Sequence, residues 1–186
     1  MKRAEILQIL KETLDPERYE HSLRVEQTAH LLAKKYKVSQ NAASLAALLH
    51  DCARRYSLPQ MLKQAKKMGI KIDPMQKQEP KLLHAELSAL LARGEFGVKS
   101  PEILNAIKKH TTGSPNMTKL EKIIYLADHI EEGRDFAGVN TMRRLAFNNL
   151  DKAILESASN MLKYLLEAGL PIYSGTIETR NYYLLK

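Results

Sequence analysis

The chain has 186 residues, of which 44% are hydrophobic and 27% are charged. These values suit one globular domain and exclude a disordered chain. The formal net charge of +8 favours an anionic partner, such as a nucleotide, a nucleic acid or a membrane surface. The single cysteine excludes an internal disulfide. The N-terminal segment carries too many charges for a signal peptide. No apolar run approaches the ~18 residues that a membrane-spanning helix needs. We therefore expect a cytoplasmic protein that does not cross a bilayer.

Helical periodicity extends along nearly the whole chain, because apolar residues recur at three- and four-residue spacing and no segment alternates with period two. The pattern predicts an all-α fold. Asp15-Pro16 and Ser100-Pro101 each pair an N-cap with a proline at the first helical position, so a helix is expected after each. The expected helices are 3–13, 17–35, 40–53, 58–68, 82–93, 102–111, 119–131, 142–147, 149–168 and 176–184.

Segments rich in glycine, proline, asparagine and aspartate separate these helices and predict loops. The expected loops are 70–81, 111–118 and 132–141. Glycine at a helix C-terminus adopts the left-handed conformation that ends the helix. The glycines in positions suited to this role are Gly69, Gly94 and Gly169.

Five of the six histidines lie near helix ends or beside an aspartate, where a metal site would need them. They are His21, His50, His84, His110 and His129. A catalytic site for a divalent metal needs neutral imidazoles and carboxylates that converge from several elements, with one position open for water. Separate helices can supply these groups here.

Two aspartates adjoin these histidines within apolar sequence. Asp51 follows the run SLAALLH, and Asp128 lies within IIYLADHIEEGRDF. A buried carboxylate without a partner is costly, so each aspartate requires a cation. For a lone buried aspartate the first alternative is a salt bridge to an arginine. The combination of Asp128 with His21 and the His50-Asp51 pair favours a metal instead.

Three arginines lie within a few residues of these candidate ligands, and guanidinium groups match phosphate oxygens bidentately. Arg18 precedes His21 by three residues, Arg54 follows Asp51 by three, and Arg134 follows Asp128 closely. We expect these arginines to bind phosphate. The alternative for each one is an ordinary surface charge.

A short segment before the last helix combines an aromatic ring, small hydroxyls and free backbone N–H groups. It comprises Leu170, Pro171, Ile172, Tyr173, Ser174, Gly175 and Thr176. A helix N-terminus suits an anion, and a ring suits a nucleobase. We interpret the segment as a nucleoside-binding element, although physical chemistry alone favours a plain turn between helices.

Six blocks of sequence, in order, resemble the YqeK-type proteins of the HD superfamily of metal phosphohydrolases. The blocks are RYEHSLRV (18–25), ALLHDCAR (47–54), LLHAELSA (82–89), AIKKHTTG (106–113), YLADHIEEGRDF (125–136) and GLPIYSGTIETRNYY (169–183). The resemblance covers nearly the whole chain. It implies an HD-domain helical bundle that cleaves diadenosine tetraphosphate symmetrically to two ADP molecules by metal-activated water.

The resemblance also implies roles for the candidate residues. One transition-metal ion is held by His21, His50, Asp51 and Asp128. The family favours iron, whereas the ligand types suit manganese, cobalt, nickel or zinc equally. Asp51, His84 and His110 are assigned to catalysis, and we prefer the last two as phosphate contacts over ligands of a second metal. The expected nucleotide contacts are Arg18, His21, Arg54, His84, His110, Asp128, Arg134 and 170–176, and an ADP- or GDP-type nucleotide is the expected product ligand.

We therefore expect one HD-type domain over 1–186, with a metal-site core at about 17–135 and C-terminal helices at 142–186 that complete the nucleotide pocket. The expected partner is a dinucleoside polyphosphate, and the resemblance implies a homodimer. Two alternatives stay open. One is another HD phosphohydrolase, acting as a nucleotidase or a cyclic-dinucleotide phosphodiesterase. The other is a non-enzymatic basic module that binds RNA or ribosomes, although the spread of the basic residues argues against a nucleic-acid stripe.

Overall fold

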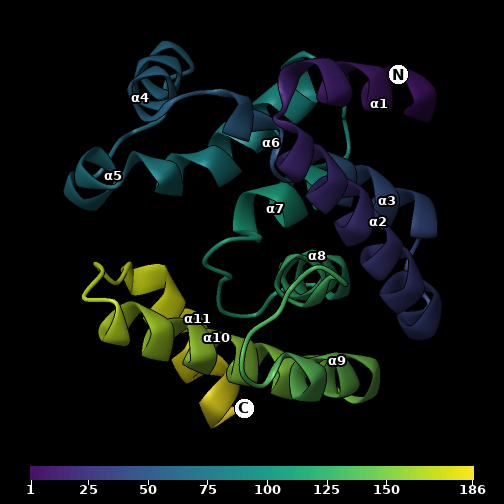
Figure 1. The fold of residues 1–186 in the computed structure, drawn as a ribbon, viewed down its shortest axis with the longest axis vertical. Helices are drawn as coiled ribbons and strands as arrows, with labels where there is room; N and C mark the ends of the chain where they lie inside the picture. The colour runs from purple at the N-terminus through teal and green to yellow at the C-terminus, as the bar shows by residue number, and fades with distance from the viewer.

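The computed structural model describes all residues 1–186 and contains helices joined by turns, without strands (Figure 1). This confirms the all-α prediction. The helices are α1 (Arg3–Thr13), α2 (Pro16–Tyr36), α3 (Gln40–Leu49), η1 (Cys52–Arg55), α4 (Leu58–Lys67), α5 (Pro74–Gln78), η2 (Pro80–Leu83), α6 (His84–Gly94), α7 (Pro101–Lys109), α8 (Lys119–Ile130), α9 (Val139–Asn148), α10 (Leu150–Glu167) and α11 (Ser174–Leu185). The two η elements are short 3-10 helices. None of the helices combines the length and hydrophobicity that crossing a membrane requires.

The two helix starts marked by proline form as the sequence predicts. The Asp15 carboxylate accepts a hydrogen bond from the Arg18 N–H at 2.9 Å, and α2 begins at Pro16. Ser100 caps α7 in the same way, with its hydroxyl accepting from Ile103 N–H. These caps satisfy backbone donors that a helix leaves free at its N-terminus.

The predicted loop at 70–81 is wrong in part, because it contains α5 and the start of η2. Asp73 and Gln76 form a reciprocal capping box, with the Asp73 side chain 2.8 Å from Gln76 N and the Gln76 side chain 3.1 Å from Asp73 N. This local chemistry starts a helix that is too short to show apolar periodicity.

Other boundaries also differ from the sequence prediction, and α9 begins at Val139, within the predicted loop 132–141. The predicted helix at 40–53 ends at Leu49, and a 3-10 turn follows. Gly94 is the last residue of α6 rather than its cap, and the chain reaches positive φ only at Gly97, with a φ of 71°.

One continuous hydrophobic core runs through the bundle and includes fully buried side chains of α2, α3, α6, α7 and α8. Leu49, Ile107 and Ala127 belong to it, and each lies within three residues of a candidate site residue. The helices that carry the site are therefore held rigidly by packing. The chain forms a single domain around this core.

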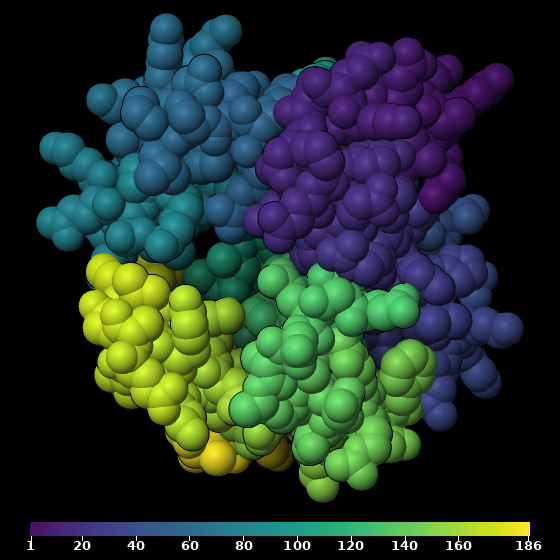
Figure 2. Space-filling view, in the orientation of Figure 1, coloured from purple at the N-terminus to yellow at the C-terminus, as the bar shows by residue number.

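The C-terminal helices α9 to α11 lie on the opposite side of α7 and α8 from α1 and α4 (Figure 1). Figure 2 shows a hollow between the blue-green segments above and the yellow-green C-terminal segments below. A cavity of about 520 Å³ also lies between the two parts of the bundle, and its lining includes Arg18, Asp51, Asp128 and Asn160. The C-terminal helices thus close the open side of the candidate metal site.

Candidate metal centre and active site

The candidate ligands come from five helices and meet at one point. His21 lies in the second turn of α2, and His50 directly follows α3 with Asp51 next to it. His84 begins α6, His110 directly follows α7, and Asp128 lies in the last turn of α8. Four of these groups sit at helix ends, where a side chain can point along the helix axis into the bundle.

Short distances join the imidazole and carboxylate groups. His21 Nε2 is 3.1 Å from Asp128 Oδ1, and His50 Nε2 is 3.9 Å from the same oxygen. His50 Nε2 is 3.6 Å from Asp51 Oδ2. On the other side, Asp51 Oδ1 lies 3.2 Å from His84 Nε2 and 3.5 Å from His110 Nε2. Asp51 therefore connects the His21-His50 side of the cluster to the His84-His110 side.

All of these histidines are oriented by a hydrogen bond at Nδ1, which leaves Nε2 directed at the cluster. His50 Nδ1 donates to the Ala47 carbonyl at 2.6 Å, and His110 Nδ1 donates to the Ile107 carbonyl at 2.7 Å. His84 Nδ1 bonds the Lys81 carbonyl, and His21 Nδ1 is 3.2 Å from Glu131 Oε1. For His21, His50 and His84, a proton fixed on Nδ1 presents Nε2 as a lone pair, which is how metal-binding histidines are prepared.

Three buried atoms of the cluster have no hydrogen-bond partner: His21 Nε2, His50 Nε2 and Asp51 Oδ1. Buried polar atoms are almost always satisfied, so these three require something the protein does not supply. Metal–ligand bonds of about 2.0–2.2 Å place neighbouring ligand atoms about 3 Å apart, close to the spacing observed. A divalent metal ion fits the site.

Three groups of residues offer ligand atoms within 4.8 Å of one another, and they overlap. They are His21-His50-Asp51, His50-His110-Asp128 and Asp51-His84-His110. The first two include the four ligands expected from the sequence. The third is compatible with either a second metal or a phosphate contact for His84 and His110, as the sequence analysis left open.

The protonation states suit cation binding. Burial lowers the pKa of His50 to about 4 and that of His84 to about 3, although the Asp51 charge opposes both shifts. Burial alone would raise the pKa of Asp51, but His50, His110 and His84 hold it well below its usual range. Asp128 is likewise held low by His21 and His50 against the effect of burial. Neutral imidazoles therefore face charged carboxylates.

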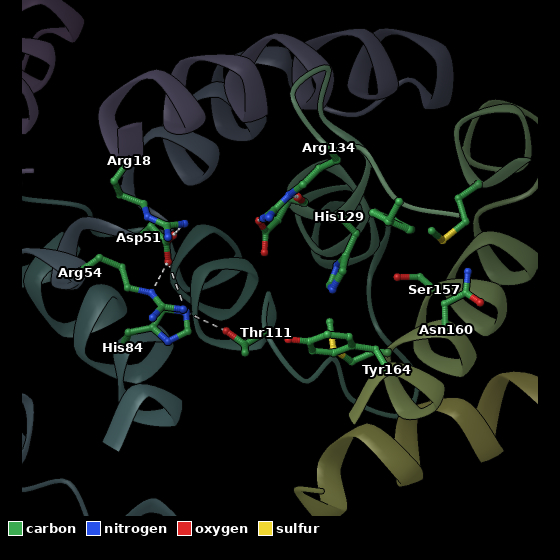
Figure 3. A pocket seen from close by; sticks show the side chains of 14 residues that line it. Arg18, Asp51, Arg54, His84, Thr111, His129, Arg134, Ser157, Asn160 and Tyr164 are labelled. Carbon is green, nitrogen blue, oxygen red and sulfur yellow. Dashed lines mark hydrogen bonds and ion pairs between the residues drawn. The ribbon is translucent and has the colours of Figure 1, made fainter. Parts of the chain in front are cut away.

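The three expected arginines line the same cavity and contact the carboxylates (Figure 3). Arg18 Nη1 is 2.9 Å from Asp51 Oδ2, and Arg54 Nε is 3.5 Å from Asp51 Oδ1. Arg134 Nη2 is 2.7 Å from Asp128 Oδ1. The salt bridge that was the alternative for Asp128 is thus present beside the candidate metal ligands. These guanidinium groups surround the cluster with positive charge.

The segment 170–176 lies beside a second cavity of about 310 Å³, which adjoins the cluster at Arg54, His84 and Thr111. Leu170, Pro171, Tyr173 and Thr176 line it, whereas Ile172, Ser174 and Gly175 do not. The Tyr173 hydroxyl donates to Asp73 Oδ2 at 3.1 Å. The helix that follows begins at Ser174, two residues before its expected start.

Two residues that the sequence analysis did not select contact the cluster. Glu131 is 2% exposed and bonds the Nδ1 atom of His21. The Thr111 hydroxyl is 3.0 Å from His84 Nε2 and 3.1 Å from His110 Nε2. The position of Thr111 directly after His110 was the available signal, whereas Glu131 ends the expected helix 119–131 within the charged run EEGRD.

The HD domain family model matches residues 18–133, so the chain belongs to the HD-domain family. A symmetrical bis(5'-nucleosyl)-tetraphosphatase of Halalkalibacterium halodurans is 40% identical over 100% of this chain and 99% of that protein. The protein of the same name from Bacillus subtilis is 36% identical over 98% of this chain and 97% of its own length. The chain therefore lies in the branch of the HD family that contains these proteins, which confirms the resemblance to the YqeK type.

A crystal structure from Clostridium acetobutylicum has the same fold. It is described as a "predicted HD superfamily hydrolase involved in NAD metabolism". It is 38% identical, with a TM-score of 0.96 over 100% of this chain and 98% of that one. The HD-domain bundle expected from the sequence is therefore confirmed over the full length.

Proposed function

We propose that this chain is a metal-dependent hydrolase that cleaves diadenosine tetraphosphate symmetrically into two ADP molecules. The observation that carries the proposal is the converging cluster of four histidines and two aspartates, with unpartnered Nε2 and Oδ1 atoms in its centre. The full-length relatives named symmetrical tetraphosphatases support the choice of substrate.

His21, His50, Asp51 and Asp128 hold one transition-metal ion in this proposal. We propose iron, from the family resemblance, and the same ligands suit manganese, cobalt, nickel or zinc. When bound, the metal supplies Lewis-acid charge and an activated water at neutral pH.

The arginines and the remaining histidines act on the polyphosphate. Arg18, Arg54 and Arg134 would neutralise phosphate oxygens and would contact phosphate in place of their carboxylate partners, while Asp51 and Asp128 would hold the metal. Water attacks one of the two central phosphorus atoms, the bond from that phosphorus to the bridging oxygen breaks, and ADP leaves. His84 and His110 lie on the Thr111 side of Asp51, where both contact the phosphates and His110 protonates the leaving oxygen.

The cavity beside 170–176 receives one nucleoside, with the Tyr173 ring as its stacking surface. Its lining also includes Arg54 and His84, so a nucleotide bound there keeps its phosphates near the cluster. ADP is the product ligand we expect at this position, and GDP fits the same chemistry. The homodimer implied by the resemblance remains a prediction.

Two other functions share parts of this site. Another HD phosphohydrolase would use the same metal centre, because the metal recognises a phosphate and nothing more. If the substrate is the tetraphosphate, substitutions of Arg18, Arg54 and Arg134 raise its KM strongly. A basic RNA-binding module would instead bind RNA with an affinity that falls steeply with salt, by roughly one power of the salt concentration for each phosphate contact. The rate of hydrolysis of a small nucleotide would depend on the metal and on pH instead.

The deciding experiment is product analysis by anion-exchange chromatography after metal-loaded protein is incubated with diadenosine tetraphosphate. We expect ADP as the sole product, lost on chelation and in Asp51→Ala. Asp135→Ala is the matched control, because Asp135 is exposed and does not line the cavity. ATP plus AMP would overturn the symmetrical cleavage. No turnover with any of these metals would favour the binding module.

A further inference from the structure

The main cavity extends well beyond the candidate metal cluster, away from the 170–176 segment. Figure 3 shows Arg18, Asp51, Arg54 and His84 on one side, Ser157 and Asn160 on the other, and His129 between them. All of these side chains line the cavity of about 520 Å³. This volume lies within the range of about 300–1,000 Å³ typical of small-molecule sites. We call the part lined by His129, Phe136, Ser157 and Asn160 the distal arm.

The distal arm carries polar groups that the protein leaves without partners. Ser157 is 2% exposed, and its Oγ lies beside the Tyr125 hydroxyl without a well-formed hydrogen bond to any group. The Asn160 amide also makes none within the chain, and it lies against Gly138, where its Nδ2 would be 3.4 Å from an added Cβ. His129 bonds the Tyr125 carbonyl through Nδ1 at 2.7 Å, which leaves Nε2 free toward the cavity. Ser157 is the buried group among these, whereas Asn160 and His129 are partly exposed. Together they offer free polar atoms to a ligand or an ordered water in the cavity.

Apolar side chains form the walls around these polar groups. Met142 and Met161 line the cavity together with the rings of Phe136 and Tyr164. Phe136 is 39% exposed and Tyr164 is 58% exposed, although both are large hydrophobic side chains. Aromatic and thioether walls around a few polar groups are typical of a pocket for a planar ring. An asparagine amide supplies both the donor and the acceptor that a purine edge can pair with.

The cluster borders two adjoining cavities rather than one. The cavity beside 170–176 and the main cavity share Arg54, His84, Thr111, Met161 and Tyr164. Symmetrical cleavage of a dinucleoside tetraphosphate produces two equal ADP halves, one on each side of the P–O bond that breaks. A site with a single nucleoside pocket would bind half of the substrate and leave the other half in solvent.

We propose that the distal arm binds the second nucleoside of the dinucleoside tetraphosphate, with Ser157 and Asn160 as its hydrogen-bonding groups. This inference rests on the proposed function, and it assigns the other nucleoside to the cavity beside 170–176. The distal arm thereby distinguishes a dinucleotide from a polyphosphate that carries one nucleoside.

The test compares two ligands that carry the same four phosphates. One is a diadenosine tetraphosphate analogue with a methylene group between the central phosphates, which resists hydrolysis, and the other is adenosine 5'-tetraphosphate, which lacks the second nucleoside. Calorimetry on metal-loaded protein measures both affinities in the wild type and in Ser157→Ala/Asn160→Ala. The matched control is Ser159→Ala/Asn148→Ala, because these residues line neither cavity.

We expect the wild type to bind the dinucleotide analogue more tightly than adenosine tetraphosphate. In the test variant, affinity for the analogue falls by about tenfold or more, because each lost hydrogen bond costs severalfold in binding. Affinity for adenosine tetraphosphate and for both ligands in the control variant stays within about twofold of the wild type. The ratio of kcat/KM for the two tetraphosphates, measured by ADP release, should fall in parallel.

Equal losses for both ligands, or no loss for either, would overturn the assignment. A melting curve for each variant separates lost binding from lost folding, and Ser157→Ala alone provides a milder change at the same place. Failure of the proposed hydrolysis would give a different result. The wild type would then release no ADP from diadenosine tetraphosphate, regardless of how tightly the variants bind the two ligands.

Discussion

His21 Nδ1 lies 3.2 Å from Oε1 of Glu131, although 110 residues separate the two in sequence. Glu131 also accepts hydrogen bonds from Arg24 Nε and from the Gly133 N–H, both at 2.6 Å. Burial alone would raise the pKa of Glu131, but these donors hold it below its usual range, so the carboxylate stays charged. It fixes the His21 proton on Nδ1 and directs Nε2 to Asp128. Glu131 is thus a positioning residue for a metal ligand.

Replacing Glu131 with glutamine should weaken metal binding by about 10- to 100-fold, the usual effect of losing a partner that orients a ligand. Competition with a chromogenic chelator measures the affinity. Glu132→Gln is the matched control, because Glu132 is exposed. Unchanged metal affinity in a folded Glu131→Gln protein would show that His21 is held in place without this carboxylate.

The sequence predicted the candidate ligands well because their chemistry is local. A histidine or aspartate at the end of an apolar helix is conspicuous, and His50, Asp51 and Asp128 meet in the structure as expected. Glu131 was missed because its burial depends on Arg24, which is 107 residues away. Its neighbours in sequence indicate only a charged helix end.

The distal arm was missed for a related reason. Ser157 and Asn160 lie on α10, whose helical periodicity was recognised, but serine and asparagine are ordinary residues for a solvent-exposed helix face. The packing of α10 against α8 and α9 turns this face toward the cavity. The packing direction of a helix is a property of the whole bundle, so periodicity within the helix cannot supply it.

Acidification should destabilise the metal-free protein. Burial lowers the pKa of His50 to about 4 and that of His84 to about 3, below the ordinary value of about 6.5. The unfolded chain therefore binds protons that the folded chain does not, and stability falls as the pH drops through this range. The pKa of His110 is raised, so this residue alone would stabilise the folded chain as the pH drops. The lowered pKa values of His50 and His84 together have the larger effect on stability.

Thermal melting of chelator-treated protein from about pH 7 to pH 4.5 measures this effect. The melting temperature should fall throughout that range, and His84→Gln should make the fall shallower. His30→Gln is the control, because His30 is exposed on α2. A melting temperature that stays constant over this range would contradict burial of neutral histidines.

Gly113 holds the turn after His110 against α11. Its φ is +68°, and a Cβ added there would lie 2.7 Å from Thr179 Cγ2. Thr179 is fully buried, and its hydroxyl donates to the Thr112 carbonyl at 2.9 Å. An added methyl group would therefore push α11 away from the turn that carries His110.

Gly113→Ala should lower the melting temperature more than Gly97→Ala does. Gly97 also has a positive φ, of +71°, but nothing lies within 4 Å of its added Cβ. Both variants share the backbone cost of about 1–2 kcal/mol, so the difference between them isolates the clash with Thr179. Equal melting temperatures would mean that α11 shifts without cost.

His110 is the histidine best placed to carry a transferable proton. Its Nε2 lies 3.0 Å from His84 Nε2, while the Nδ1 of each ring bonds a backbone carbonyl. A hydrogen bond between two Nε2 atoms requires a proton on one of them. Burial alone would lower the pKa of His110, but the nearby Asp51 carboxylate raises it, whereas burial lowers the pKa of His84 to about 3. The proton therefore resides on His110.

The variant His110→Gln keeps an N–H donor but cannot transfer a proton, so kcat should fall by about 10²- to 10⁴-fold. Metal content should change little if His110 is not a ligand, as elemental analysis of the purified variant can show. The pKa of His110 is raised in the folded protein, so the activity of the wild type should fall as the pH rises through that pKa. The residual activity of His110→Gln should not show this fall at high pH. Loss of metal from the variant would instead assign His110 to metal binding, the alternative that its position beside Asp51 leaves open.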